Sequence, residues 1–487
     1  MQLFELIKDM PYLMETRGDM ATQIAAVTNN SRDKVEHGLF FCIPGARFDA
    51  HDFAPQAVAN GCVALVVERF LEVDVPQVKV SNGRAAMARM AAAFYGHPAA
   101  GMKLIGITGT KGKTTTSYMT KAIFEQAGYK CGLIGTTGNM IGQKHLPGSL
   151  TTPDPIELQR DLRQMADENV QVVIMEVSAH AIDMHRLDGL TFEAACYTNF
   201  SQDHLDYFHT MEQYFLTKKS FFTSGMVRNA ALNADEETSP RVREDLTIPH
   251  LTYGICVAAD LFARDIEINE DGVVFELQLQ GMHPVQVKLH MPGMFNIYNA
   301  MAAASCAMIL GVSADDIRLG LESMTGVPGR IEMLPTGTPY RIILDYAHSP
   351  DSLQSILKTV REFTRGRLIA VFGCGGDRDK GKRPIMGEIG GNMADLCILT
   401  SDNPRNEDPM VILSAIEEGI KLTGKPYEVI ENRREAIRRA MQIAQEGDII
   451  VLAGKGHETY QDIRGEKHPF DEKVVVQQLL DEMREEH

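Results

Sequence analysis

The chain has 487 residues, with 48 Lys or Arg against 65 Asp or Glu, so its formal net charge is −17. So acidic a chain is a poor nucleic-acid wrapper, because phosphate binding needs clustered basic residues, although a local site for a small anion stays possible. Hydrophobic residues make up 44% and charged residues 23%, ordinary values that exclude disorder, collagen and coiled coil.

The first residues of the chain and its cysteines indicate in which cellular compartment the protein is expected. Residues 1–13 are apolar but interrupted by Glu5 and Asp9, with no preceding basic region, so we do not expect a signal peptide. No apolar run approaches the ~20 residues of a membrane helix. The eight cysteines are scattered and none forms a CxxC pair, which predicts small core residues rather than disulfides or a zinc site. We therefore expect a cytoplasmic protein.

Short apolar runs rich in β-branched residues predict buried parallel strands. These runs are 63–67, 104–107, 172–175, 342–344, 368–372, 396–399 and 449–452. Helical stretches lie between them at 114–127, 155–166, 299–310 and 351–363, and a charged helix is expected at about 471–487. The alternation predicts a doubly wound α/β fold.

Six of these strands run directly into a loop rich in glycine or charged residues. The loops are 108–115, 176–180, 345–348, 373–379, 400–405 and 453–458. Ligands of open α/β sheets bind outside the carboxyl ends of the strands. Six such loops are hard to attribute to chance, so we expect the ligand sites at these ends.

The strongest motif is the first loop, Gly106-Ile-Thr-Gly109-Thr-Lys-Gly112-Lys113-Thr114-Thr115. Its glycines let backbone N–H groups converge on phosphate oxygens, and a helix N-terminus follows. Lys113 would reach the β- and γ-phosphates, and the Thr114 hydroxyl would bind Mg²⁺. The spacing is GxxGxxGK, with Ile107 where the general P-loop pattern has glycine. A plain glycine-rich turn is the alternative, but the order of strand, loop, Lys-Thr and helix favours nucleotide binding.

Three further features could serve a nucleotide site, and each has a structural alternative. Glu176 ends a strand, where a carboxylate commonly holds Mg²⁺, although it could also face solvent. His204 could be a metal ligand, but a lone histidine is more often structural. Lys218 and Lys219 lie in an aromatic-flanked helical stretch, 214–222, and could be a snorkelling pair.

Residues 150–157 have the pattern of a helix start. Asp154 is the expected N-cap, Pro155 the first helical residue and Glu157 the reciprocal capping partner. This assignment leaves Thr151 and Thr152 unexplained.

Together these motifs resemble the Mur ligases, ATP-dependent enzymes that build the peptide stem of the bacterial cell wall. The resemblance covers essentially the whole chain, from Asn30-Ser31-Arg32 to Gly454-Lys-Gly-His-Glu458, and GxxGxxGK is the family's own form of the loop. It implies three domains, which the Gly- and Pro-rich segments 96–102 and 326–338 would separate. They are a smaller α/β domain for the uridine nucleotide at 1–98, a central P-loop ATPase with a mostly parallel sheet at 99–330, and a Rossmann-like amino-acid-binding domain at 331–487.

The resemblance also implies a reaction in peptidoglycan precursor synthesis. ATP phosphorylates the D-Glu carboxylate of UDP-N-acetylmuramoyl-L-alanyl-D-glutamate, and the amine of an amino acid attacks the acyl phosphate. The products are an amide, ADP and phosphate. Mg²⁺ and Lys113 would screen the approaching anions. We expect small-molecule substrates only, no nucleic acid and no membrane insertion; the oligomeric state stays open, with a monomer expected.

Site residues follow from the resemblance position by position. The ATP loop is Gly109, Thr110, Lys111, Gly112, Lys113, Thr114 and Thr115, and Asn296, Arg330, Asp345 and His348 are further nucleotide contacts. The catalytic set is Lys113, Glu176, His204 and Lys218, of which the last three, with Thr114, would form the metal site. Lys218 lies fourteen positions after His204, the family's spacing for a lysine that CO₂ carbamylates. Ser31 would meet the uridine nucleotide, and the muramoyl-peptide would meet Thr151, Thr152, Ser178 and Arg186. Met184 stands where relatives carry Gln, so that contact is not expected here.

The segment Asp402-Asn403-Pro404-Arg405 resembles the form found in the family members that add meso-diaminopimelate. Arg405 can grip the distal carboxylate of that amino acid bidentately, and lysine lacks this group. Arg378, Gly454 and Glu458 match other contacts, with Glu458 suited to the distal ammonium. Taken alone, the segment could be an ordinary Asn-Pro turn. A lysine-adding or D-Ala-D-Ala-adding ligase, a folylpolyglutamate synthetase and a P-loop nucleotide switch without ligation stay open as alternatives.

Overall fold

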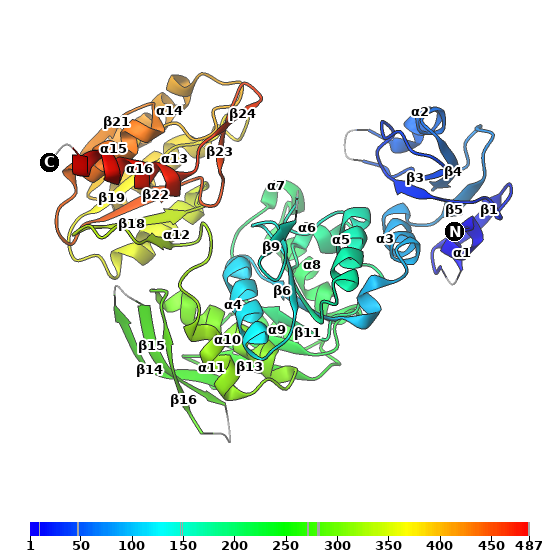
Figure 1. Cartoon of the computed structure of the whole chain (residues 1–487), viewed down its shortest axis with the longest axis horizontal. Coiled ribbons are helices and arrows are strands. Elements are labelled where there is room, and N and C mark those ends of the chain that lie inside the picture. Colours follow the sequence, from blue (N-terminus) through cyan, green and yellow to red (C-terminus); the bar gives the residue numbers. More distant parts are fainter. Residues whose placement is uncertain are drawn as a thin grey trace. The chain divides into compact units, whose positions relative to one another are not determined.

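The structure is a computed structural model that describes residues 1–8, 10–45, 48–146, 148, 150–269, 272–279 and 283–485. It is an α/β protein with three larger sheets and one two-stranded ribbon, in which most strands of the larger sheets run parallel (Figure 1). The expected fold class is therefore confirmed. Among the described residues, no helix is both long and apolar enough to cross a membrane.

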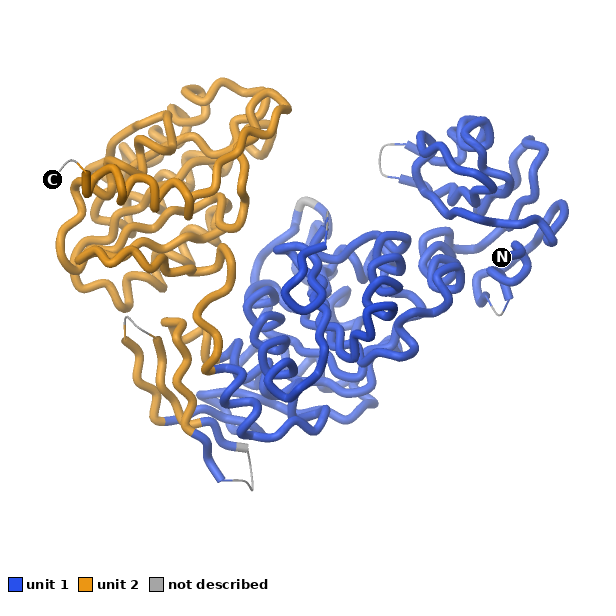
Figure 2. Tube along the Cα trace, in the orientation of Figure 1, with its two compact units in different colours: residues 1–264, 277–285, 298–321 blue, residues 265–276, 286–297, 322–487 orange. Residues whose placement is uncertain are grey.

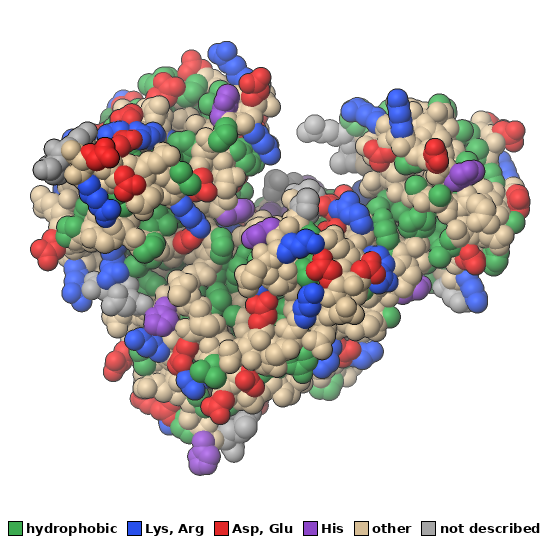
Figure 3. All heavy atoms as spheres, in the orientation of Figure 1, with side chains coloured by type: hydrophobic (Ala, Val, Ile, Leu, Met, Phe, Trp, Pro, Cys, Tyr) green, Lys and Arg blue, Asp and Glu red, His purple; other side chains and the backbone are tan. Residues whose placement is uncertain are grey.

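The chain separates into two compact units (Figure 2). Unit 1 comprises residues 1–264, 277–285 and 298–321, and unit 2 comprises 265–276, 286–297 and 322–487. The division into 1–98, 99–330 and 331–487 stays a prediction. On the face drawn in Figure 3, Lys and Arg side chains are mixed with Asp and Glu rather than gathered in one stripe.

The first sheet has five strands in the order β1-β5-β4-β3-β2, and only β1 is antiparallel to its neighbour. Their bounds are β1 Leu13–Arg17, β2 Ala26–Thr28, β3 Gly38–Phe41, β4 Cys62–Val67 and β5 Gln77–Val80. Helices α1 (Leu3–Ile7) and α3 (Gly83–Phe94) contribute to one core, and α2 (Ala54–Ala59) contributes to another. The expected strand 63–67 is β4.

The second sheet has eleven strands in the order β16-β15-β14-β13-β12-β11-β6-β10-β7-β8-β9. Its parallel centre comprises β6 Lys103–Thr108, β7 Cys131–Ile134, β10 Val172–Glu176, β11 Ala194–Tyr197, β12 Ala230–Asn233 and β13 His250–Gly254. The remaining strands are β8 Asn139–Ile141, β9 Lys144–Leu146, β14 Leu261–Asn269, β15 Gly272–Leu279 and β16 Val285–Leu289. Its helices are α4 Lys113–Gln126, α5 Pro155–Asp167, α6 Ala179–Asp183, α7 Leu205–Phe208, α8 Met211–Thr223, α9 Ser239–Arg243, α10 Met294–Ile309 and α11 Ala314–Glu322.

The third sheet has six strands in the order β17-β18-β22-β19-β20-β21, and only β17 is antiparallel. The strands are β17 Glu332–Leu334, β18 Arg341–Asp345, β19 Leu368–Phe372, β20 Leu396–Leu399, β21 Tyr427–Val429 and β22 Ile449–Ala453. Helices α12 Pro350–Arg361, α13 Lys382–Met393 and α14 Pro409–Lys421 pack on one face, and α15 Arg433–Ile443 and α16 Glu472–Glu485 on the other. Alternate residues of β18, β19 and β22 point into the two cores, as a doubly wound sheet requires. The ribbon is β23 Tyr460–Ile463 with β24 Glu466–Pro469.

Parallel register places the loops that follow these strands at one edge of each sheet. In the second sheet, Glu176 at the end of β10 pairs with Ile107 of β6, and Thr108 pairs with Tyr197 of β11. In the third, Asp345 at the end of β18 pairs with Ala453 of β22. All seven expected strands are present to within one residue at each end, and the expected helices are present, although α10 begins five residues before position 299.

Two smaller expectations have different outcomes. Seven of the eight cysteines are buried and all are free, as expected; Cys256 is exposed. The capping interpretation of Asp154 is wrong in part, because Asp154 is the N-cap residue of α5 but its side chain makes no capping hydrogen bond. Its carboxylate lies 3.0 Å from Arg186 Nε instead.

Candidate active site

The phosphate loop connects β6 to α4 and requires glycine at two positions. Gly109 has φ of +147°, and a Cβ there would lie 2.0 Å from Thr198 Oγ1. Gly112 has φ of +82°, and a Cβ there would lie 2.4 Å from Asn299 Oδ1. Residues 113–115 then form the first turn of α4, with the side chains of Thr114 and Thr115 buried. The loop is therefore a backbone-lined cradle before a helix N-terminus, which suits a phosphate group.

Asn199, at the carboxyl end of β11, holds this cradle in shape. Its Oδ1 accepts the Lys111 N–H at 2.8 Å, and its carbonyl accepts the Thr110 N–H at 2.9 Å. The Thr110 hydroxyl donates to the Ser201 carbonyl at 3.2 Å. Sequence reasoning did not assign Asn199 to the site, although its position after an apolar strand was the available signal.

Two lysine amino groups converge on one carbonyl of the cradle. Lys113 Nζ donates to Gly109 O at 3.0 Å and to Thr110 O at 2.9 Å, and Lys218 Nζ donates to Gly109 O at 2.8 Å. Lys218 is 1% exposed, so the snorkelling interpretation is wrong for it. Lys219 points elsewhere, with Nζ 2.6 Å from Asp245 Oδ2.

The burial of Lys218 changes its chemistry. Burial, followed by the nearby charge of Lys113, holds the pKa of Lys218 well below its ordinary value of 10.5, and Asp203 opposes this shift. Lys218 Nζ also lies over the Tyr214 ring, 4.7 Å from its centroid. A lowered pKa favours the neutral amine, which is the nucleophilic form.

Glu176 is 1% exposed, so the alternative that it faces solvent is wrong. Its Oε2 accepts the Thr114 hydroxyl at 3.1 Å and the Thr136 hydroxyl at 2.9 Å, and its Oε1 accepts the Thr136 N–H at 3.0 Å. The carboxylate therefore adjoins the threonine expected to bind Mg²⁺. Thr136 was not predicted from the sequence, because it becomes a neighbour only through the pairing of β7 with β10.

His204 is placed differently from Glu176. It has φ of +54° at the start of α7, its side chain is 45% exposed, and its Nε2 lies 3.5 Å from Asp203 Oδ2. Its ring stands edge-on to His180 with centroids 4.7 Å apart. Among the residues that the structure describes, no three His, Cys, Asp or Glu side chains are grouped to hold a metal ion. Mg²⁺ commonly takes only one or two protein carboxylates, with phosphates and waters completing its shell.

The four residues expected to bind the muramoyl-peptide are linked by hydrogen bonds, directly or through one neighbour, to Glu176. Thr152 Oγ1 donates to the Glu176 carbonyl at 2.8 Å and accepts the Ser178 N–H at 3.1 Å. Arg186 Nη1 donates to the Thr152 carbonyl at 2.7 Å, and Thr151 Oγ1 lies 3.1 Å from Thr136 Oγ1. Ser31, expected to meet the uridine nucleotide, lies between β2 and β3, where its hydroxyl donates to Gln56 Oε1 at 3.0 Å.

Unit 2 carries the remaining expected nucleotide contacts. Asp345 is buried and accepts the Ile331 and Ala347 N–H groups at 2.9 and 2.8 Å; burial raises the pKa of Asp345, against the charge of Arg330. The Arg330 guanidinium lies 5.5 Å from the centroid of Tyr346. His348 Nδ1 lies 2.7 Å from the Tyr346 carbonyl. Asn296 lies apart from these three at the start of α10, donating to Pro292 O at 2.8 Å.

Several residues expected to contact the amino acid lie together at the carboxyl ends of β20 and β22. Asn403 Nδ2 donates to Glu458 Oε2 at 2.9 Å, and a Cβ on Gly454 would lie 2.3 Å from Asp402 Oδ2. Asp402 and Asn403 are buried, whereas Glu458 keeps 16% of its side chain exposed. The structure thus brings residues 402–403 and 454–458 together across some fifty positions of sequence.

The two arginines of the expected pocket differ. Arg405 has φ of +50°, and its Nη1 donates to the Gly376 carbonyl at 2.9 Å; the Pro404 carbonyl accepts the Glu407 N–H at 3.0 Å in a tight turn. Arg378 is exposed, and its contact with the Asp377 carbonyl is long at 3.5 Å. Sequence reasoning missed Lys455, whose buried ammonium contacts both Asn403 and Glu458.

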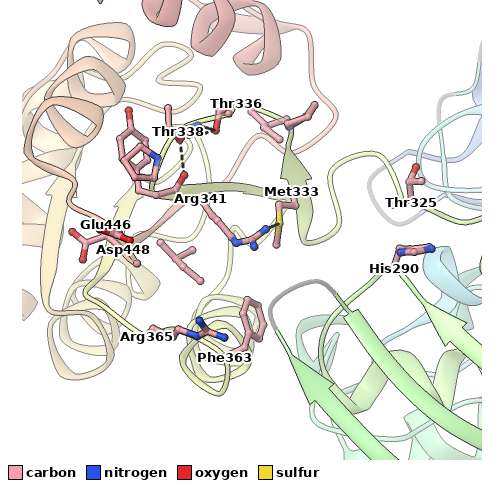
Figure 4. A pocket seen from close by; sticks show the side chains of 17 residues that line it. His290, Thr325, Met333, Thr336, Thr338, Arg341, Phe363, Arg365, Glu446 and Asp448 are labelled. Atoms are coloured by element: carbon pink, nitrogen blue, oxygen red, sulfur yellow. Dashed lines mark hydrogen bonds between the residues drawn. The ribbon is translucent and has the colours of Figure 1, made fainter.

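A separate cavity of about 630 Å³ lies in unit 2 (Figure 4). Its lining includes Arg341 and Ile449, which begin β18 and β22, together with Arg365 and His290. It therefore adjoins the amino ends of these strands, and none of the predicted site residues lines it.

Family models match most of the chain. They are "Mur ligase family, catalytic domain" over residues 23–95, "Mur ligase middle domain" over 107–307, and "Mur ligase, glutamate ligase domain" over 329–456. The chain is similar to UDP-N-acetylmuramoyl-L-alanyl-D-glutamate–2,6-diaminopimelate ligase 1 of Clostridium acetobutylicum, with 43% identity over 488 residues that cover 99% of this chain and 100% of that protein. It is 45% identical over 465 residues to the diaminopimelate ligase of Halalkalibacterium halodurans, covering 94% and 95% of the two chains.

Solved structures agree. A structure of UDP-N-acetylmuramoyl-L-alanyl-D-glutamate–2,6-diaminopimelate ligase matches with a TM-score of 0.71 and 32% identity, covering 99% of both chains. MurF from Acinetobacter baumannii matches with a TM-score of 0.66 at 21% identity, over 99% of this chain and 98% of its own, and shows the shared fold alone. The chain therefore belongs to the Mur ligase family.

Proposed function

We propose that this ligase adds meso-diaminopimelate to UDP-N-acetylmuramoyl-L-alanyl-D-glutamate with consumption of ATP. The observation that carries the proposal is the cluster of Arg405, Asn403 and Glu458, which follow the carboxyl ends of β20 and β22, the two parallel strands on either side of β19. One cationic and one anionic side chain suit the distal amino-carboxylate end of diaminopimelate. Relatives with 43% and 45% identity carry the name of that activity.

The phosphate loop is the proposed ATP site. Gly109 and Gly112 have positive φ and pack too closely against Thr198 and Asn299 to carry a Cβ, and the N-terminus of α4 follows. Lys113 is near enough to exchange its two loop carbonyls for phosphate oxygens. Asn296, Arg330, Asp345 and His348 are proposed as further nucleotide contacts on the strength of the family resemblance.

The donor set beside this loop fits Mg²⁺. The Thr114 hydroxyl and the Glu176 carboxylate are hard oxygen donors and already adjoin. A bound Mg²⁺ would neutralise phosphate charge. The ammonium of Lys218 cannot bind a metal, but its neutral amine can react with CO₂ to form a carbamate, with release of a proton, and a carbamate is an oxygen donor. The lowered pKa of Lys218 supports this modification, and His204 is proposed as the remaining ligand.

The remaining residues are proposed to bind the two substrates other than ATP. Arg186, with Thr151, Thr152 and Ser178, would hold the dipeptide so that its D-Glu carboxylate meets the γ-phosphate, and Ser31 would meet the uridine nucleotide. The D-Glu carboxylate is a poor electrophile, and its phosphorylation gives an acyl phosphate with a good leaving group. Arg405 and Glu458 would orient the incoming amino acid. The domains 1–98, 99–330 and 331–487 would supply the uridine, ATP and amino-acid sites respectively.

A screen of amino-acid substrates tests the proposal. Purified enzyme is given ATP, Mg²⁺, bicarbonate and the UDP-dipeptide, and ADP release is measured with meso-diaminopimelate, L-lysine or D-Ala-D-Ala. We expect release only with meso-diaminopimelate. Equal turnover with L-lysine would contradict the assignment of meso-diaminopimelate as the substrate. ADP release without any amino acid would favour a nucleotide switch.

The variant Arg405→Ala sharpens the screen. Loss of a charge-assisted, bidentate contact should raise the KM for diaminopimelate by about 30-fold or more while the KM for ATP stays the same. Arg464→Ala is the matched control, because Arg464 also has positive φ, adjoins Arg405 through its backbone, and has an exposed side chain. An Arg405→Ala enzyme with the wild-type KM would contradict the pocket assignment.

A further inference from the structure

Lys455 is a fully buried lysine beneath the proposed amino-acid pocket, with 0% of its side chain exposed. Its Nζ lies 3.1 Å from Asn403 Oδ1 and 3.2 Å from Glu458 Oε2. We propose that Lys455 is a positioning residue for the amino-acid substrate: it orients Asn403 and Glu458 so that the pocket presents a fixed carboxylate. This inference rests on the proposed function, because it assigns Glu458 to an ammonium of the substrate.

The first step of the argument is the orientation of Asn403. An amide oxygen accepts hydrogen bonds and an amide nitrogen donates them. Asn403 Oδ1 receives two donors, Lys455 Nζ at 3.1 Å and the Asp462 N–H at 2.9 Å. Because Lys455 can only donate, the amide cannot flip, and its Nδ2 must point to Glu458, which it meets at 2.9 Å.

The second step is the carboxylate of Glu458. Within the described part of the chain, its hydrogen bonds to Asn403 and Lys455 both use Oε2. The side chain is 16% exposed although its lysine partner is fully buried. Asn403 and Lys455 therefore hold Oε2 in place. We expect Oε1 to accept a hydrogen bond from the ammonium of the substrate.

The third step is the free-energy cost of burying the Lys455 ammonium. A lysine ammonium without exposure is strongly unfavourable unless it is paired and hydrogen-bonded, so its presence needs a compensating partner. Glu458 is that partner, and an amide completes the contacts. Removing the ammonium should therefore release Asn403 and Glu458 together, which weakens the substrate's ammonium contact without touching the phosphate loop.

The fourth step is the rigidity of the support. Two residues before Lys455, the Ala453 carbonyl accepts Arg433 Nη2 at 2.9 Å, and Arg433 pairs with Glu472 at 2.8 Å with both side chains fully buried. The segment that carries Lys455 is thus anchored to α15 and α16 from beneath.

The variant Lys455→Met tests the proposal by steady-state kinetics of ADP release. We expect the KM for meso-diaminopimelate to rise by about 10- to 100-fold, as for loss of a hydrogen bond to a charged group, while kcat and the KM values for ATP and the UDP-dipeptide stay within about 3-fold. Lys421→Met is the matched control, since its ammonium pairs with Glu417 on the exposed side of α14. An unchanged KM for diaminopimelate overturns the proposal, and so does an equal loss for all three substrates.

A double-mutant cycle separates positioning from a general structural role. If Lys455 acts through Glu458, the double variant K455M/E458Q should be no worse than E458Q alone, within about 2-fold. Multiplied losses would show independent action and overturn the proposal. Where K455M does not fold, Lys455→Gln, which keeps a donor without the charge, replaces it with the same expected KM effect.

The two proposals fail in different ways. A wild-type enzyme that does not use diaminopimelate contradicts the proposed function. A wild-type enzyme that uses it, beside a K455M or K455Q variant with wild-type KM, contradicts the Lys455 proposal alone.

Discussion

At the scale of single residues, Lys218 shows how environment overrides residue type. Its amino group has no exposure to water and shares the Gly109 carbonyl with the amino group of Lys113. Burial of Lys218 and the nearby charge of Lys113 both disfavour protonation of the Lys218 amine. A site that needs an uncharged amine gains from this arrangement, whereas the stability of the fold does not.

The lowered pKa of Lys218 predicts a pH-dependent penalty on folding. Between the lowered folded-state pKa and the ordinary value of 10.5, the unfolded chain binds a proton that the folded chain does not, so the free energy of unfolding rises with pH in this window. Lys218→Met should therefore be stabilised by about 1 kcal/mol at pH 7 and lose that advantage as pH approaches 10.5, while ligase activity is lost. Thermal unfolding of both proteins across this range measures the difference.

Lys219→Met is the control, since Lys219 pairs with Asp245 and its pKa plays no part in the argument. An advantage of K218M that stays constant with pH would show that the lysine is charged in the folded protein.

At the scale of elements, the start of α5 has the sequence of a helix N-cap, but the cap residue Asp154 contacts a neighbouring side chain and does not cap the helix. Asp154 and Pro155 occupy the first positions of the helix as expected, yet the Asp154 carboxylate turns to Arg186. Arg186 in turn donates to the Thr152 carbonyl, beside the predicted dipeptide site. The cap residue therefore orients a side chain of the site and does little for the helix.

Alanine substitution at two helix starts should separate these roles. Asn432 is an effective cap, because its side chain accepts the Glu435 N–H at 3.2 Å, so Asn432→Ala should lower the free energy of unfolding by about 1 kcal/mol. Asp154→Ala should cost less than about 0.5 kcal/mol at physiological salt, because its carboxylate is 46% exposed and caps nothing. Urea denaturation compares the two. Equal losses would show that Asp154 does cap α5 in solution.

At the scale of the whole molecule, the two units each contain their own apolar clusters, and within unit 2 two ion pairs differ in burial. In unit 2, Arg433 and Glu472 are fully buried, whereas Arg439 and Glu428 form a pair with side chains 44% and 33% exposed. Breaking a buried pair leaves an uncompensated charge in the core, and breaking an exposed one leaves a charge in water.

Hydrogen exchange should report this difference locally. Glu472→Gln is expected to lower protection of β22 by about 3 kcal/mol, because Arg433 keeps its charge and loses its partner. Glu428→Gln should change protection by less than about 1 kcal/mol. Strand β6 of unit 1, which contacts neither pair, is the internal reference. A loss in β6 equal to that in β22 would contradict the local effect.

Strands and motifs were predictable from the sequence because they depend on neighbours along the chain. Apolar runs of four or five residues marked β6, β10, β19 and β22 correctly. The same local view left open whether Glu176 and Lys218 face solvent, because burial depends on elements that are distant in sequence, and the structure buries both side chains. Lys455 was passed over for the same reason, since its partner Asn403 is 52 positions away.

The sequence by itself determined the α/β class, because that class depends on the pattern of apolar residues along the chain. It also determined the phosphate loop and the order of the strand-end motifs, because these depend on short fixed spacings. Only the tertiary structure decided which polar groups meet. Parallel pairing brought Thr136 to Glu176, helix α8 delivered Lys218 to the phosphate loop, and the ends of β20 and β22 joined Asn403, Lys455 and Glu458. The physical reason is that pairing and burial are properties of the packed chain, and these two properties set the charge and reach of each side chain.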